Sequence, residues 1–175
     1  MARELGAQRR FLSRSPEATE RLGEQLGRAA PPGTVIALEG DLGAGKTAFV
    51  RGIARGLGVE GPVTSPTFAL LQQYEGRLPL HHFDAYMEGR ERAFLADGGL
   101  EHLHEGGVAV VEWAPRVVDF LPTPRLWVVL EHRGPEVRAI SVRVDGAEGP
   151  GRPLARIVAS LGARGETAGE LEEIR

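Results

Sequence analysis

Apolar side chains recur at helical spacing near the start of the chain, at Ala18, Leu22, Leu26 and Ala29. The three residues before this stripe are typical of a helix start. Ser15 can cap the free N–H groups, Pro16 fits the first helical position, and Glu17 faces the positive end of the helix. The segment Pro31-Pro32-Gly33 ends this stripe. The pattern predicts a helix that begins at Ser15, after a short strand at Phe11-Leu12.

A continuous apolar run follows, and a glycine-rich segment separates it from a second helical stripe. The run is Val35-Ile36-Ala37-Leu38, within a strand expected over Thr34–Glu39. Gly58 suits the end of the following helix, whose apolar face consists of Phe49, Val50, Ile53 and Leu57. The order strand, glycine-rich loop and helix is therefore predicted for this region.

The second half of the chain contains shorter apolar runs, which are typical of the strands of a sheet. The strands Phe68–Tyr74 and Leu78–Phe83 flank turn residues and predict a hairpin, and a second hairpin is expected from Leu126–Glu131 and Val137–Val144. The other expected elements are a broken helix over Arg90–Leu103, a buried strand over Val108–Val111 and a last short helix over Leu154–Leu161.

The loop between the first buried strand and its helix carries a phosphate-binding motif. Residues 40–47 read Gly-Asp-Leu-Gly-Ala-Gly-Lys-Thr and fit G-x-x-x-x-G-K-[ST] at every fixed position. The glycines let successive N–H groups point at one anion, and the helix adds its positive end. Lys46 is the only lysine in the chain, and its compact ammonium suits the β- and γ-phosphates as a point charge. The hydroxyl of Thr47 suits Mg²⁺.

This motif predicts a site for a nucleoside triphosphate with magnesium. The expected nucleotide-binding residues of the loop and helix start are Gly40, Asp41, Leu42, Gly43, Ala44, Gly45, Lys46, Thr47 and Ala48. With the element order, it predicts an α/β fold: a P-loop NTPase-like single domain, with a mixed β-sheet flanked by helices and with β-hairpins. We place this domain at residues 1–161 and expect residues 162–175 to form a polar, mobile tail.

Two carboxylates end strands that we expect beside the loop. Glu112 follows the apolar run Val108–Val111, the usual form of a Walker B strand, and Asp84 follows the strand Leu78–Phe83. A P-loop enzyme needs such a carboxylate to hold Mg²⁺ or to orient water. We interpret both residues in this way; the alternative is that each only caps a turn.

Three other features have two interpretations each. Thr64, Ser65 and Thr67 form a hydroxyl-rich loop, either a switch that senses the γ-phosphate or an ordinary proline turn. Trp113 either stacks on a base or packs in the core. We interpret four of the five histidines as structural, because their spacing does not favour joint metal binding; they are His81, His82, His102 and His104.

Composition narrows the class of protein. The chain of 175 residues is long enough for one domain, and its lack of cysteine excludes disulfides and thiol catalysis. Neither a signal peptide nor an apolar run of the ~20 residues of a membrane span is present, so we expect a cytoplasmic protein with no membrane partner. A net charge of −3 and a pI of about 6.0 argue against unaided binding of nucleic acid. We interpret the basic cluster of Arg9, Arg10 and Arg14 as a solvated edge.

Missing motifs exclude other nucleotide-binding classes. The chain has no asparagine and no second lysine, so it lacks the Asn-Lys-x-Asp motif with which guanine-specific GTPases read their base. It also lacks the Leu-Ser-Gly-Gly-Gln segment of ABC ATPases. A P-loop small-molecule kinase stays open as the alternative, with Arg90 and Arg92 on a lid over the phosphates.

Four motifs together resemble the bacterial TsaE family, formerly called YjeE. They are Gly-Asp-Leu-Gly-Ala-Gly-Lys-Thr at 40–47, Thr-Ser-Pro-Thr-Phe at 64–68, His-His-Phe-Asp-Ala-Tyr at 81–86 and Val-Glu-Trp at 111–113. Their order and rough spacing match the family, and the resemblance covers about residues 10–145.

This resemblance implies a slow ATPase that works with protein partners. TsaE proteins associate with the TsaB–TsaD pair, which attaches a threonylcarbamoyl group to N6 of adenosine 37 in tRNAs that read codons starting with A. The family member does not transfer the group but hydrolyses ATP, which resets the complex. The implied partners are therefore TsaD-like and TsaB-like proteins, with tRNA contacted only indirectly.

The resemblance also implies residue roles. Lys46 would contact phosphate, Thr47 and Glu112 would hold Mg²⁺, and Asp84 would be needed for hydrolysis. Thr67 would lie in the switch-like loop, and Trp113 and Glu17 would lie near the nucleotide. Family members usually carry Arg where this chain has Met87, so that role would move to Arg90 or Arg92, or be absent.

Overall fold

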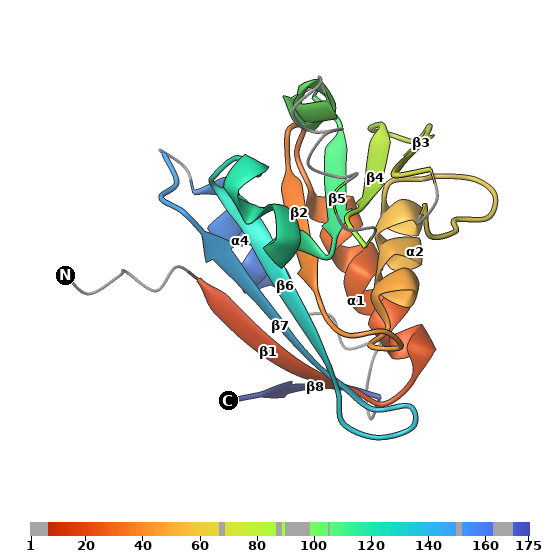
Figure 1. The fold of residues 1–175 in the computed structure, drawn as a ribbon. Coiled ribbons are helices and arrows are strands. Elements are labelled where there is room, and N and C mark those ends of the chain that lie inside the picture. Colours follow the sequence, from red (N-terminus) through yellow and green to blue (C-terminus); the bar gives the residue numbers. More distant parts are fainter. Residues whose placement is uncertain are drawn as a thin grey trace.

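One mixed sheet forms the frame of the protein (Figure 1). The computed structural model describes residues 7–66, 69–86, 89, 99–104, 106–149, 152–162 and 170–175. Within these, the strands are β1 (Gln8–Ser13), β2 (Val35–Glu39), β3 (Leu71–Tyr74), β4 (Leu80–Asp84), β5 (Val108–Glu112), β6 (Arg125–His132), β7 (Arg138–Asp145) and β8 (Leu171–Ile174). The α-helices are α1 (Pro16–Ala29), α2 (Lys46–Gly56) and α4 (Pro153–Ser160), and the 3-10 helices are η1 (Gly99–His104) and η2 (Ala114–Phe120).

The centre of the sheet is parallel and both sides are antiparallel. The described strands follow the order β3-β4-β5-β2-β6-β7-β1-β8. Strands β4, β5, β2 and β6 run parallel, whereas β3 pairs antiparallel with β4, and β7, β1 and β8 continue antiparallel beyond β6. The carboxyl ends of the parallel strands therefore meet at one edge, where open α/β sheets bind their ligands.

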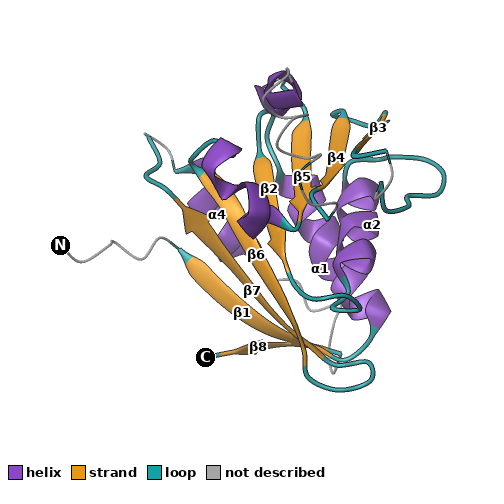
Figure 2. Ribbon diagram, viewed as in Figure 1, coloured by secondary structure: helices purple, strands orange, loops and turns teal. Residues whose placement is uncertain are grey.

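Alternating side chains of the central strands pack on opposite faces of the sheet. Ile36 and Leu38 of β2 join the larger apolar cluster, which includes α1, α2 and α4. Val35 and Ala37 join a smaller cluster under η2. The strand is therefore apolar throughout because both faces are covered, as in α/β proteins. Figure 2 shows α1 and α2 side by side against the sheet.

Glycines allow α1 and α2 to approach closely. A Cβ atom at Gly23 would lie 2.3 Å from the Phe49 oxygen, and one at Gly52 would lie 2.0 Å from the Glu20 oxygen. Such distances are shorter than any van der Waals contact, so these positions need glycine. The close contact fixes α2, and with it the loop that precedes α2, against the rest of the core.

Most elements expected from the sequence are confirmed. The side chain of Ser15 caps α1 by accepting a hydrogen bond from the N–H of Ala18 at 3.1 Å, and Pro16 is the first helical residue. Both expected hairpins form, as β3–β4 and β6–β7. Of the broken helix expected over Arg90–Leu103, residues 90–98 lie outside the described residues, and η1 covers the rest.

The C-terminal residues differ from the expectation of a mobile tail. Residues Leu171–Ile174 form β8, which pairs antiparallel with β1. Arg9 and Arg14 of the basic cluster form ion pairs with Glu173 and Glu172. The sequence pattern missed this strand because its apolar ends, Leu171 and Ile174, give no clear alternation, and its position depends on the free edge of β1. The boundary proposed at residue 161 stays a prediction.

Candidate functional site

The glycine-rich loop has the backbone form of an anion-binding cradle. It joins β2 to α2, and Gly43 and Gly45 adopt positive φ values of 77° and 97°, which side chains with a Cβ rarely adopt. Among the described residues, no side chain caps the start of α2, whose N-cap residue is Gly45. Such a loop at a helix N-terminus favours a phosphate group.

Lys46 lies folded against its own loop. Its ammonium donates hydrogen bonds to the carbonyl oxygens of Gly40 and Asp41, the latter at 2.8 Å, and lies 4.3 Å from the centroid of the Trp113 ring. Burial lowers the pKa of Lys46 below its ordinary value, while the carboxylates of Glu112 and Asp84 act in the opposite direction. A phosphate would therefore replace carbonyl partners that already hold this cation in place.

The two predicted carboxylates lie side by side next to this loop. Asp84 and Glu112 are direct register partners at the ends of β4 and β5, and each is only 3% exposed. A cavity of about 480 Å³ brings together eight of the predicted site residues, among them Lys46, Thr47, Asp84, Glu112 and Trp113. The loop residues Leu42, Gly43 and Gly45 line the same cavity.

Hydrogen bonds hold both carboxylates in fixed orientations. The hydroxyl of Ser65 donates to Oδ2 of Asp84 at 2.8 Å, and the N–H of Tyr86 donates to Oδ1 at 2.8 Å. Nε2 of His82 lies 2.8 Å from Oε1 of Glu112, with both side chains buried. An ionised Glu112 accepts this bond, so its second oxygen is the one available to a ligand.

His82 therefore contacts a predicted site residue, although the sequence suggested only a structural role. The available signal was its position two residues before Asp84, which puts both side chains on the same face of β4. What the sequence could not supply was the pairing of β4 with β5, which places that face beside Glu112.

An aromatic and cationic cluster borders the cavity. The Trp113 ring lies 5.2 Å from the Tyr86 ring, and the guanidinium of Arg116 lies 5.2 Å from the Trp113 ring. Arg116 also donates a hydrogen bond to the Tyr86 carbonyl. Trp113 and Arg116 line a second cavity of about 510 Å³ on the side of Gly40 and Asp41. Sequence reasoning missed Tyr86 and Arg116, since neither stands in a motif position that specifies phosphate chemistry.

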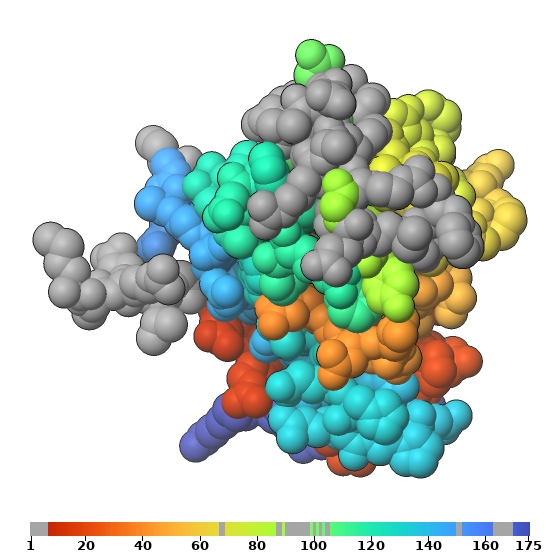
Figure 3. Space-filling view, viewed as in Figure 1, coloured from red at the N-terminus to blue at the C-terminus, as the bar shows by residue number. Residues whose placement is uncertain are grey.

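The surface around the loop combines segments that are distant in sequence. Figure 3 shows the orange surface of the loop and of α2 between the cyan β6–β7 connection and the blue-green η2. Leu42 is 74% exposed and Tyr86 is 36% exposed; these are the large exposed apolar side chains of the described part of the chain.

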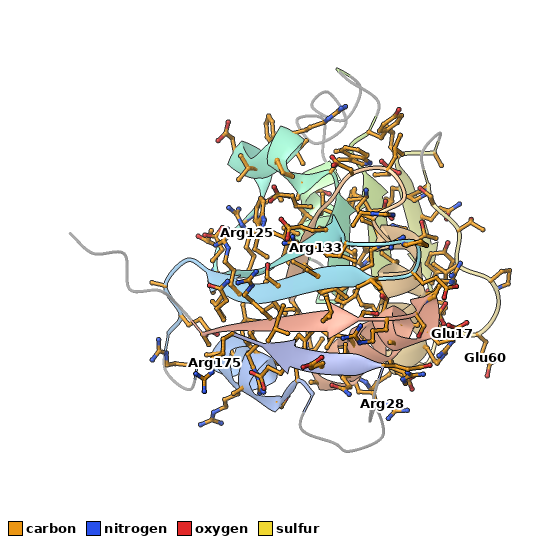
Figure 4. All side chains as sticks on the ribbon, turned by 90° about the horizontal axis from the view of Figure 1, so that it is seen from below. Glu17, Arg28, Glu60, Arg125, Arg133 and Arg175 are labelled. Atoms are coloured by element: carbon orange, nitrogen blue, oxygen red, sulfur yellow. The ribbon has the colours of Figure 1, made fainter. Side chains whose placement is uncertain are left out.

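Other predicted site residues are less closely tied to the cavity. Ala48 is buried in the first turn of α2. Glu17 is exposed on the first turn of α1, at the edge of the molecule in Figure 4, and does not line either cavity. Thr67, Met87, Arg90 and Arg92 lie outside the described residues. The roles expected for these residues stay predictions.

The oxygen donors suit a magnesium ion that binds together with phosphates. The Thr47 hydroxyl and the Asp84 and Glu112 carboxylates border one cavity. Within the described residues, no group of three or more His, Asp or Glu side chains could hold a metal alone. Mg²⁺ in nucleotide sites takes one or two carboxylates and completes its shell with phosphates and water, so this donor set fits it.

Comparison with known proteins matches most of the chain to the family that its sequence motifs resemble. Residues 13–140 match the model of the family described as "Threonylcarbamoyl adenosine biosynthesis protein TsaE". The TsaE protein of Bacillus subtilis is 42% identical over 134 residues, which cover 75% of this chain and 83% of that protein. The TsaE protein of Treponema pallidum is 46% identical over 113 residues, covering 65% of this chain and 84% of that protein.

A solved structure shares the fold. The crystal structure of Bacillus subtilis YdiB superposes with a TM-score of 0.69 at 36% sequence identity. The superposition covers 82% of this chain and 90% of the YdiB chain. The mixed sheet with its flanking helices is therefore common to both proteins.

Proposed function

This chain belongs to the TsaE family, and from that premise we propose that it is the ATP-binding and ATP-hydrolysing component of tRNA threonylcarbamoyladenosine formation. The observation that carries the proposal is the cavity in which the P-loop Lys46 and Thr47 meet the strand-end carboxylates Asp84 and Glu112. Binding and hydrolysis of a nucleoside triphosphate need these groups together.

Each residue has a defined part in this proposal. The loop N–H groups and Lys46 bind the phosphates, and the Thr47 hydroxyl and Glu112 hold Mg²⁺. The ion, when bound, neutralises charge that develops on the phosphates. Asp84, held by Ser65 and the Tyr86 N–H, orients the water that attacks the γ-phosphate. His82 keeps Glu112 in one orientation.

We further propose that the chain acts on tRNA through other proteins. With a net charge of −3 it lacks the basic balance of a protein that holds nucleic acid unaided. The partners would be TsaB-like and TsaD-like proteins, which carry out the transfer to N6 of adenosine 37, and ATP turnover would be slow without them. Among the described residues, no helix is long and apolar enough to cross a membrane. A cytoplasmic location follows as part of the proposal.

The test is ATP turnover with Mg²⁺, first by the purified chain and then with a TsaB–TsaD pair. We expect slow turnover that rises with the pair and is lost in Glu112→Ala. The exposed carboxylate of Glu75, on the β3–β4 turn, provides the matched control, and Glu75→Ala should behave like the wild type. ATP binding without a response to the pair would refute the proposed pathway. ATP consumption only with a small acceptor present would indicate the kinase instead.

A further inference from the structure

Arg138, the first residue of β7, reaches across to the phosphate-binding loop. Its Nη2 donates a hydrogen bond to the Gly43 carbonyl at 2.9 Å, and its Nε donates to the Ala44 carbonyl at 3.1 Å. A Cβ atom at Gly45 would lie 3.8 Å from Nε and Cγ of Arg138. The guanidinium therefore packs along three consecutive residues of the loop.

The same guanidinium is anchored in its own hairpin. Nη1 donates to the carbonyls of Gly134 at 2.9 Å and Val137 at 3.0 Å, both in the β6–β7 connection. No carboxylate of the described residues forms an ion pair with Arg138 within 4.0 Å. The rigid guanidinium, which carries five N–H donors, thus joins the phosphate-binding loop to the β6–β7 connection. Its hydrogen-bond partners in both segments are carbonyl oxygens.

These contacts determine which way the N–H of Gly45 points. A peptide group is planar and trans, so its carbonyl and the next N–H lie on opposite sides. Because Arg138 holds the Ala44 carbonyl, the N–H of Gly45 points away from the guanidinium. Gly45 also has the positive φ of 97° that a succession of N–H groups around one anion requires.

We propose that Arg138 is a positioning residue of the nucleotide site, which holds the Gly43–Ala44 carbonyls outward so that the loop is preformed for phosphate. The inference rests on the proposed binding of ATP and extends it to a residue outside the loop. A preformed loop loses less conformational freedom when the nucleotide binds, and this raises affinity. Lysine at this position could serve one carbonyl but could not bridge the two segments.

The test is the affinity of the folded protein for ATP with Mg²⁺, measured by calorimetry on four proteins. These are the wild type, Arg138→Ala, Arg138→Lys and the control Arg133→Ala. Arg133 lies in the same hairpin, is half exposed and pairs only with Glu131 among the described residues. We expect a loss of at least about 10-fold for Arg138→Ala, since two charge-assisted hydrogen bonds to the loop are lost. The affinity of Arg138→Lys should lie between those of the wild type and Arg138→Ala. The affinity of the control should stay within about 2-fold of the wild type.

Two further measurements distinguish a role of Arg138 in the nucleotide site from a role in the stability of the fold alone. Thermal unfolding of each variant identifies a temperature at which all four proteins are folded. Their affinities for ATP with Mg²⁺ are compared at that temperature. Millimolar methylguanidinium should restore part of the affinity of Arg138→Ala and leave the control unchanged. If Arg138→Ala does not fold, Arg138→Lys supplies the comparison. Wild-type affinity in the Arg138 variants would overturn the inference and leave the proposed function intact, whereas a wild type that binds no ATP would overturn both.

Discussion

At the scale of single residues, the site holds its charged groups in place before a nucleotide arrives. Lys46 is 6% exposed and bonded to carbonyls of its own loop, and Glu112 is bonded to His82. Buried polar groups keep such partners because an unpaired group costs free energy. The site therefore keeps its charged groups oriented until phosphate replaces the carbonyl partners of Lys46, and this order is what preorganises a charge-stabilising site.

Replacing Lys46 should remove most of the affinity for ATP. Lys46→Ala deletes a charge-assisted phosphate contact of about 1.5–3 kcal/mol, which corresponds to roughly 10- to 150-fold. Calorimetric titration with ATP and Mg²⁺ measures the loss. An affinity equal to that of the wild type would contradict the P-loop assignment.

The lowered pKa of Lys46 also predicts a pH dependence of stability. The unfolded chain keeps the ordinary lysine value of 10.5 and the folded chain a lower one, so between these values the unfolded state binds more protons. The stability of the wild type relative to Lys46→Met should therefore rise as the pH increases toward 10.5. Denaturant unfolding of both proteins from neutral pH upward measures this difference. A difference that falls with pH would show that the ammonium is not disfavoured by burial.

At the scale of elements, the pair α1–α2 depends on the absence of side chains. Glycines at 23 and 27 of α1 face glycines at 52 and 56 of α2, and a Cβ atom at any of them would lie 2.0 to 2.3 Å from a backbone oxygen of the other helix. Arg51 and Arg55 then pair with Glu20 across the interface. The position of the P-loop follows, because α2 begins at Lys46.

Gly52→Ala should destabilise the fold, although alanine usually favours a helix by about 0.5–1 kcal/mol over glycine. Its methyl group would collide with the Glu20 carbonyl, and overpacking of this kind typically costs about 1–3 kcal/mol. Denaturant unfolding measures the change. Arg28→Ala, on the exposed surface of α1, is the control and should shift stability by less than about 0.5 kcal/mol. A more stable Gly52→Ala protein would refute the close approach.

The edge strand β8 should loosen in acid. The hydrogen bonds of Arg21 and Arg9 lower the pKa values of Glu170 and Glu173 below the ordinary 4.5. The contribution of these two ion pairs to the stability of the fold is therefore complete above pH 4.5. It is lost as the pH falls through the lowered pKa values. NMR spectra should show that residues 171–174 lose their native shifts at a higher pH than β6 does. Simultaneous loss in both strands would mean that these ion pairs do not hold β8.

At the scale of the whole molecule, the parallel centre of the sheet gathers the site. The P-loop follows β2, Glu112 ends β5 and Asp84 ends β4, and these strands are neighbours. A ligand that touches all three ends bridges three adjacent strands of the sheet. Binding to the folded state alone must then stabilise the entire domain by linkage.

MgATP should therefore raise the melting temperature. At a free concentration of about 100 times Kd the expected stabilisation is about 2.7 kcal/mol, or roughly 5–10 °C for a domain of this size. Scanning calorimetry with and without MgATP measures the shift, and Lys46→Ala, with its roughly 10- to 150-fold weaker binding, should show about half of it at most at the same concentration. An equal shift in that variant would mean that ATP binds elsewhere.

The sequence by itself determined the features that lie within short segments. The strand, glycine loop and helix of residues 35–56 could be predicted because motif and periodicity act between near neighbours. Asp84 and Glu112 could be predicted as strand ends, and four motifs together indicated the family. Their placement in one cavity agrees with those expectations.

Only the tertiary structure decided which distant residues support the site. His82 contacts Glu112 because β4 lies beside β5, and Arg138 reaches Gly43 and Ala44 because β6 and its hairpin lie beside β2. The strand β8 exists because β1 offers it a free edge. None of these contacts leaves a local pattern, since each depends on the order and register of strands that the chain brings together only when it folds.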